Sequence, residues 1–126
     1  MKRLWAIPVL AAILAVLCVT TSRSVQQFCG DGAARLETAV AQLDNGDSDA
    51  AAELLRSVAA DFDAWRRVSS TFLRHSEMDP VQESLTEASA CAEIAAWDDF
   101  RTACRQAQMR LVHLADNERP TMGNLW

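Results

Sequence analysis

The sequence predicts an all-α protein, with an N-terminal transmembrane helix followed by an antiparallel bundle of about four helices. Three observations support this prediction. Residues 4–22 carry no charged side chain, glycine occurs only 4 times among 126 residues and tyrosine is absent, and apolar residues after position 24 recur at helical spacing. The length fits one domain and a targeting segment, so we expect an anchor at residues 1–23 and a helical extracytoplasmic domain at residues 24–126.

The N-terminal segment has the length and flanking charges of a membrane anchor. Residues 4–22 rise about 28 Å as a helix, which is close to the thickness of a bilayer core. Lys2 and Arg3 precede this run and Arg23 follows it. The positive-inside rule then predicts a single-pass protein of the cell membrane, with a cytoplasmic N-terminus and an extracytoplasmic C-terminal domain.

Two other interpretations of this segment stay open. It could be a cleaved signal peptide, for which Val19-Thr20-Thr21 supplies a poor match to the small-residue cleavage pattern. It could also be a lipoprotein signal that ends at Cys18, but Leu17 stands where such sites need a small side chain. We therefore favour an uncleaved signal-anchor that contacts the lipid bilayer through residues 4–22.

Charge excludes one class of partner. The whole chain carries a net charge of −5, and residues 24–126 hold 9 basic and 17 acidic side chains. Such an acidic domain repels the phosphates of nucleic acids and of anionic lipids. We therefore expect no nucleic-acid partner.

Turn and capping residues interrupt the chain after residue 24. A helix at residues 24–43 should be kinked or broken at Gly30-Asp31-Gly32, because two glycines cost about 2 kcal/mol relative to alanine in a helix interior. Gly46 suits the left-handed position after that helix, and Asp47 or Ser48 can cap the next one.

The next predicted helix, residues 48–76, carries an apolar stripe. Its spacing alternates between four and three residues, and we interpret its aromatic side chains as core packing rather than as a ligand site. The stripe comprises Ala51, Leu54, Leu55, Val58, Phe62, Trp65, Val68, Phe72 and Leu73.

Two more helices are predicted at residues 80–95 and 98–117. Asp79 would cap the first, with Pro80 at its first position, and Asp98 would cap the second. The inward positions of the last helix are Phe100, Ala103, Cys104, Ala107, Leu111 and Leu114. The shared pattern Asp-x4-Ala at Asp47 and Asp98 also suggests a tetratricopeptide-like repeat, but we prefer the antiparallel bundle.

Cys91 and Cys104 form a candidate disulfide. A hairpin that turns near residues 97 and 98 places them opposite each other, and an oxidising compartment would permit the bond. The alternative is that both are small buried hydrophobic residues without a covalent link.

One cluster of acid-base and metal-ligand side chains is found, His75-x-Glu77-x-Asp79. It could form a ligand or metal site at a helix junction. The alternative assigns separate roles to its members, namely a histidine favoured by a helix C-terminus, a solvated glutamate and a capping aspartate. The spacing matches no known metal signature, and the sequence has no nucleophile elbow, phosphate loop or Cys-x-x-Cys motif. We therefore predict no metal, no cofactor and no enzymatic activity.

The chain combines Asp-x4-Ala at Asp47, the spacing Trp65-x9-His75-x-Glu77-x-Asp79, a helix pair that follows and a terminal Asn124-Leu125. Together these features resemble the DUF4363 family of small membrane-anchored bacterial proteins of unknown function. The resemblance covers most of the chain and implies a single-pass helical protein, without a known activity, cofactor or catalytic residue. The chain departs from the family in being rich in arginine and alanine rather than lysine, and in having Ser48 where family members often carry an aromatic residue.

The sequence thus predicts an uncharacterised helical interaction or scaffold module outside the cytoplasm. Its expected partners are another membrane protein or further copies of itself. The alternative function is a ligand or metal sensor that uses His75, Glu77 and Asp79.

Overall fold

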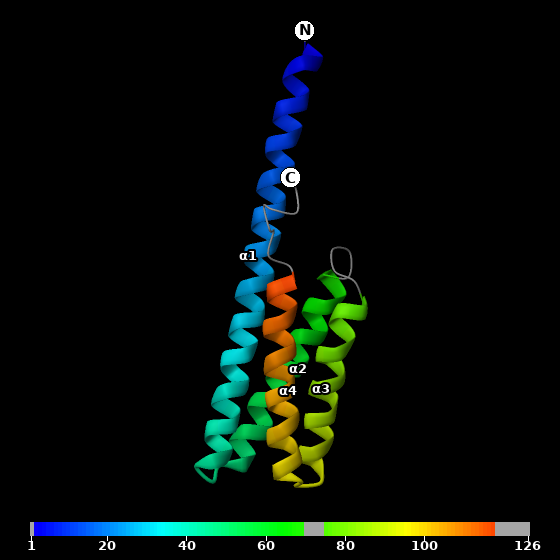
Figure 1. The fold of residues 1–126 in the computed structure, drawn as a ribbon. Coiled ribbons are helices and arrows are strands. Elements are labelled where there is room, and N and C mark those ends of the chain that lie inside the picture. The colour runs from blue at the N-terminus through cyan, green and yellow to red at the C-terminus, as the bar shows by residue number, and fades with distance from the viewer. Residues whose placement is uncertain (1, 70–74, 118–126) are drawn as a thin grey trace.

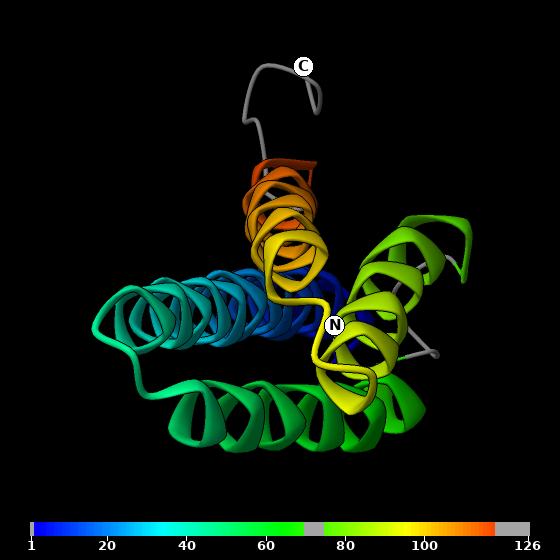
Figure 2. The same cartoon turned by 90° about the horizontal axis from the view of Figure 1, so that it is seen from below.

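In the computed structural model, which describes residues 2–69 and 75–117, the chain folds into four helices. These are α1 (Lys2–Asp44), α2 (Ser48–Ser69), α3 (His75–Glu93) and α4 (Trp97–Asn117). α1 packs against α2 and α4, and α3 packs against the same two helices, so the four helices surround a common core (Figures 1 and 2). The predicted all-helical class and the helical bundle are confirmed.

The predicted fold, a transmembrane helix followed by a bundle of about four further helices, is corrected, because the N-terminal segment is part of α1, and α1 is itself one of the four helices of the bundle. It passes through residue 23 and through Gly30-Asp31-Gly32 without a break. Its first half projects beyond the ends of the other helices, and its second half is one of the four helices of the bundle (Figure 1). Gly32 is buried, and a Cβ atom added there would lie 3.1 Å from Cδ1 of Leu111, so this glycine permits a close approach of α4 rather than a kink.

The predicted membrane span is also contradicted. Within the described part of the chain, no helix combines the length and apolar character needed to cross a membrane. The predicted signal-anchor at residues 4–22 and the single-pass location in the cell membrane, with a cytoplasmic N-terminus and an extracytoplasmic domain, are therefore corrected.

The turn between α1 and α2 has the predicted chemistry. Gly46 has a φ of 88°, and its N–H donates to the carbonyl of Leu43 while the N–H of Asp47 donates to that of Gln42. This is a Schellman motif, in which glycine takes the left-handed position. Oδ1 of Asp47 then accepts a hydrogen bond from the N–H of Ala50 at 3.1 Å, which confirms Asp47 as the cap of α2.

The turn between α3 and α4 repeats this hydrogen-bond pattern without a glycine. The N–H groups of Ala95 and Ala96 donate to the carbonyls of Ala92 and Cys91, and Ala95 takes a left-handed φ of 57°. α4 begins at Trp97, so Asp98 lies in its first turn and is not the predicted cap.

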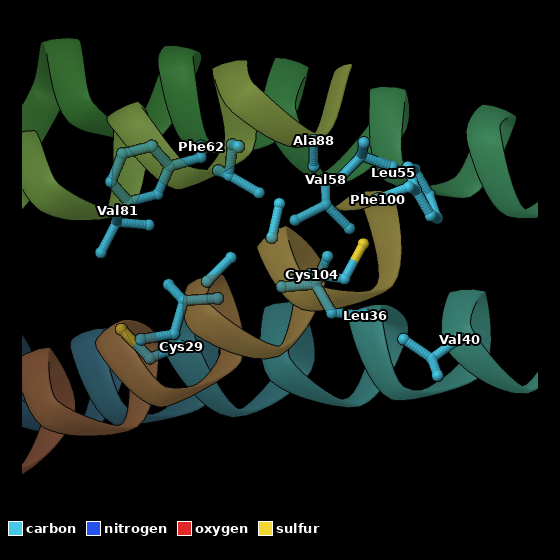
Figure 3. Packing of buried hydrophobic residues seen from close by; sticks show 14 of the residues in the cluster. Cys29, Leu36, Val40, Leu55, Val58, Phe62, Val81, Ala88, Phe100 and Cys104 are labelled. Atoms are coloured by element: carbon cyan, nitrogen blue, oxygen red, sulfur yellow. The ribbon is translucent and has the colours of Figure 1, made fainter. Parts of the chain in front are cut away.

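The core is built from one face of each helix (Figure 3). Every inward position predicted for α4 is buried, as are Ala51, Leu55, Val58 and Phe62 of α2. Val68, predicted to widen the stripe of α2, is exposed instead. The largest fully buried side chains are Phe62, Phe100, Leu36, Leu55, Met78, Leu85, Leu111, Leu114, Val40 and Val81.

Candidate functional site

The aromatic residues near the end of α2 belong to the core. Phe62 is buried, and the rings of Phe28 and Trp65 stack with centroids 4.4 Å apart and planes 7° apart. Phe62 lies 5.8 Å from Trp65 between ring centroids. Aromatic pairs in this geometry add stability beyond the area that they bury. The interpretation of Phe62 and Trp65 as core packing is confirmed, whereas Phe72 and Leu73 lie outside the described residues.

The predicted site at His75, Glu77 and Asp79 lies in the first turns of α3. The helix begins at His75, so Asp79 is not the cap of a helix that starts at Pro80, as we predicted. Residues two apart in a helix lie about 200° apart around its axis, whereas residues four apart share a face. The backbone therefore places positions 75 and 79 on one side of α3 and position 77 on the other.

Asp79 has a structural partner. Its carboxylate accepts a hydrogen bond from Nη2 of Arg66, which joins the start of α3 to the end of α2. The side chains of His75 and Glu77 lie outside the described part of the structure. Among the side chains that are described, no group of three His, Cys, Asp or Glu residues could hold a metal ion. The metal or ligand site at this junction stays a prediction.

The two cysteines of the candidate disulfide lie in the α3–α4 hairpin. Cys104 is buried in α4 and Cys91 is half-buried in α3, and both are reduced in this structure. The pKa of the Cys104 thiol is raised to about 12, mainly by burial, which is opposed by Arg105 and supported to a smaller extent by Cys91. Burial, Asp99 and Glu87 raise the pKa of Cys91 as well. Both groups are therefore neutral thiols at physiological pH, and the disulfide stays a prediction.

Two open grooves flank the second half of α1. One, of about 740 Å³, lies between α1 and α2 and is crossed by an ion pair of 2.9 Å between Arg35 and Asp61. The other, of about 510 Å³, lies between α1 and α4 and includes Met109, Val112 and His113, which are exposed. Neither groove contains a convergent set of catalytic side chains among its described residues.

The first half of α1 is the feature that most distinguishes the molecule. Its described side chains from Leu4 to Thr20 are all exposed, on every side of the helix. A helix that is apolar around its whole circumference is normally covered on all sides. Sequence reasoning treated this run as a uniform apolar segment and missed the order within it. That order is a three-four-three spacing of Ile7, Leu10, Leu14 and Leu17.

Comparison with known proteins identifies a family. No curated protein matches the chain, and no solved structure matches it. The profile of a family described as a domain of unknown function (DUF4363) matches residues 19–125. The match covers most of the chain, including the second half of α1 and all of α2, α3 and α4. The chain therefore belongs to the DUF4363 family.

Proposed function

We propose that this protein is a helical interaction module that associates with further copies of itself through the first half of α1. The carrying observation is the continuous helix whose projecting half is apolar and exposed while its other half is packed in the bundle (Figure 1). Contiguous exposed apolar surface of this extent marks an interaction site. We propose no catalytic role for the chain.

One stripe along this half has the spacing of a coiled-coil seam. Ile7, Leu10, Leu14 and Leu17 alternate steps of three and four residues, and they are between 56 % and 70 % exposed. In heptad terms, Ile7 and Leu14 take the a positions and Leu10 and Leu17 the d positions. Copies of one sequence can therefore interdigitate along this stripe with the helices parallel.

A second stripe implies more than two copies. Val9, Ile13 and Val16 are also exposed, and they lie roughly a third of a turn around the helix from the first stripe. A dimer that uses one stripe would leave the other in water. A ring of three or more helices would cover both stripes of each copy, because every helix then contacts two neighbours.

The acidic bundles oppose this association. Residues 24–126 of each copy carry a net charge of −8, and parallel α1 helices would bring these domains to the same end of the assembly. Charge repulsion between exposed groups weakens with ionic strength, because the Debye length falls from about 30 Å at 0.01 M salt to about 8 Å at 0.15 M. Association should therefore strengthen as salt is added.

The test uses the full chain and sedimentation equilibrium, with and without mild detergent. The wild-type protein should have the mass of three or more chains, corrected for bound detergent, with a larger associated fraction at 0.15 M salt than at 0.01 M. Leu10→Glu combined with Leu14→Glu should yield a single chain. Met109→Glu combined with Val112→Glu is the matched control, because these α4 residues are exposed and apolar but lie outside the stripes, and it should keep the wild-type mass.

Two results would overturn the proposal. One is a wild-type protein with one chain per particle, including a single chain that binds only detergent micelles or lipid vesicles. The other is a Leu10 and Leu14 variant that keeps the wild-type mass. The alternative function, a ligand or metal sensor, gains no support from the register of positions 75, 77 and 79 or from the pairing of Asp79 with Arg66.

A further inference from the structure

The groove between α1 and α4 contains two uncovered apolar side chains. Met109 and Val112 are 71 % and 52 % exposed, and both line this groove of about 510 Å³. Being three residues apart in α4, they lie on the same face of the helix. Among the described residues of α2, α3 and α4, the other exposed large apolar side chains are Val68 and Ile94, and neither lines this groove. Scattered exposed apolar residues need no explanation, whereas neighbouring ones in a concave surface suit a binding groove.

The charged and polar side chains of this groove are balanced and largely paired. Arg105 and Asp116 contribute one charge of each sign. Arg105 and Gln108 both donate hydrogen bonds of 2.9 Å to Oε2 of Glu37 in α1. These contacts turn two polar groups of the groove toward α1 and leave the apolar pair uncovered. The groove therefore suits an uncharged apolar segment.

The chain leaves α4 beside this groove. α4 ends at Asn117, and the groove extends into the last turn of the helix. The nine residues 118–126 that follow lie outside the described part of the structure. The last six of them, residues 121–126, carry no charged side chain. Their large apolar members are Met122, Leu125 and Trp126. This segment therefore matches the groove in charge and in apolar character.

The segment is also long enough to follow the groove. Pro120 cannot continue a helix, so it suits a reversal of direction soon after α4. From there, residues 121–126 can span about 20 Å when extended. Met109 lies eight residues before Asn117, which is about 12 Å along the helix axis. Trp126 can therefore reach Met109.

The family comparison includes this segment in the matched domain. The DUF4363 profile extends through residue 125, eight residues beyond the end of α4. The segment is therefore part of the same family unit as the bundle rather than an addition to it.

We propose that residues 121–126 turn back along α4 and occupy the groove between α1 and α4, with the indole of Trp126 against Met109. A tryptophan ring buries a large apolar area, and contacts between methionine sulfur and an aromatic ring are favourable. The bound segment would hold the end of α4 against α1, close to the place where the first half of α1 projects from the bundle (Figure 1). This inference does not depend on self-association through α1.

The first test compares groove substitutions in the full chain and in a variant that ends at Asn117. Met109→Glu combined with Val112→Glu should lower the thermal unfolding midpoint of the full chain by about 5 °C, because the new charges exclude the apolar segment. In the shortened chain the same substitutions should change the midpoint by no more than about 1 °C, because no segment is left to displace. Ile94→Glu, at an exposed apolar position of α3, is the matched control and should have the same effect in both chains.

The second test locates the segment directly. Benzoylphenylalanine, a photoreactive amino acid, is incorporated at position 126 of the full chain, and the irradiated protein is digested with trypsin. The cross-link should join the peptide 111–126 to the peptide 106–110, which contains Met109, or should join position 126 to Val112 within its own peptide. The cross-linked protein should have the mass of one chain on a denaturing gel.

Two results would overturn the proposal. The groove substitutions could lower the midpoint equally in the full and the shortened chains. The photo-cross-link could fail to reach the groove, because it joins position 126 to the peptide 4–23 of α1, to a second chain or to no residue at all.

Discussion

The two halves of α1 share their secondary structure but differ in burial and in packing. In the second half, the buried positions Val25, Cys29, Gly32, Leu36 and Val40 recur every three or four residues and face α2 and α4. In the first half, the described side chains are exposed on all sides, and the helix extends beyond its neighbours (Figure 1). The same backbone geometry is therefore packed against α2 and α4 in one half, whereas the described side chains of the other half are exposed.

This difference indicates what stabilises each half of α1. Most helical stability in proteins comes from packing an amphipathic face, since isolated helices of this length are marginal in water. The second half obtains that packing inside the bundle. The described side chains of the first half are exposed, which is why we propose the interaction function there.

The largest expected difference between the halves concerns leucine truncation. Leu36 is 0 % exposed, so Leu36→Ala should lower the free energy of unfolding of the bundle by about 3 kcal/mol, from lost burial and the cavity that remains. Leu10→Ala in the first half should change that free energy by no more than about 0.5 kcal/mol and should instead weaken association. Urea unfolding followed by circular dichroism measures the first quantity, and sedimentation measures the second. Equal losses of bundle stability in the two variants would contradict this distinction.

Hydrophobic periodicity predicted the core of the molecule well. The inward residues of α4 and the buried positions of α2 up to Phe62 follow from the 3.6-residue repeat alone, and Gly46 and Asp47 carry their turn and cap signals locally. Such features depend on neighbours in sequence, so a single sequence contains them.

The errors arose where a tertiary contact outweighed a local signal. Gly30 and Gly32 indicated a break, but the packing of α1 against α2 and α4 maintains the helix through both. Asp79 indicated a cap, but α3 begins four residues earlier and Asp79 pairs with Arg66. Asp98 indicated a cap, but Ala95 adopts the left-handed conformation and α4 begins at Trp97. The first two contacts are not encoded within a few residues of the position that they decide. The Asp98 error is local instead, because Ala95 takes the left-handed conformation without a glycine to signal it.

The two glycines give a second test with a smaller effect. Gly30 is exposed and an added Cβ would meet nothing within 4 Å, so Gly30→Ala should stabilise the bundle by up to about 1 kcal/mol. At Gly32 the new methyl group would lie 3.1 Å from Cδ1 of Leu111, so the gain in helix propensity should be offset by displacement of that side chain. Thermal unfolding of both variants measures the difference. A Gly32→Ala variant as stable as Gly30→Ala would show that α1 and α4 do not approach closely at this point.

The smallest expected effect concerns a polar contact between α1 and α4. Oε2 of Glu37 accepts hydrogen bonds of 2.9 Å from Nε2 of Gln108 and from Nη1 of Arg105, and Gln108 also donates to the carbonyl of Ala33 at 3.1 Å. These two hydrogen bonds, from Gln108 first and then Arg105, together with the charge of Arg105, lower the pKa of Glu37 below its ordinary value of 4.5. Because the pKa of Glu37 is lower in the folded state than in the unfolded state, its ionised carboxylate stabilises the fold at pH values above the unfolded-state pKa. This stabilisation is lost as the pH falls through the folded-state pKa.

Glu37→Gln should therefore lower the thermal midpoint slightly at pH 7, and its difference from the wild type should shrink as the pH falls below 4.5. Glu93→Gln, at the exposed end of α3, is the control for removing one acidic charge from the bundle. The first half of α1 has no carboxylate side chain, so Glu37→Gln tests a contact with α4 that only the second half of α1 makes. Two results would show that this contact does not help to hold α1 against α4. In one, the change in thermal midpoint caused by Glu37→Gln stays constant from pH 7 to pH 3. In the other, it equals the change caused by Glu93→Gln at every pH.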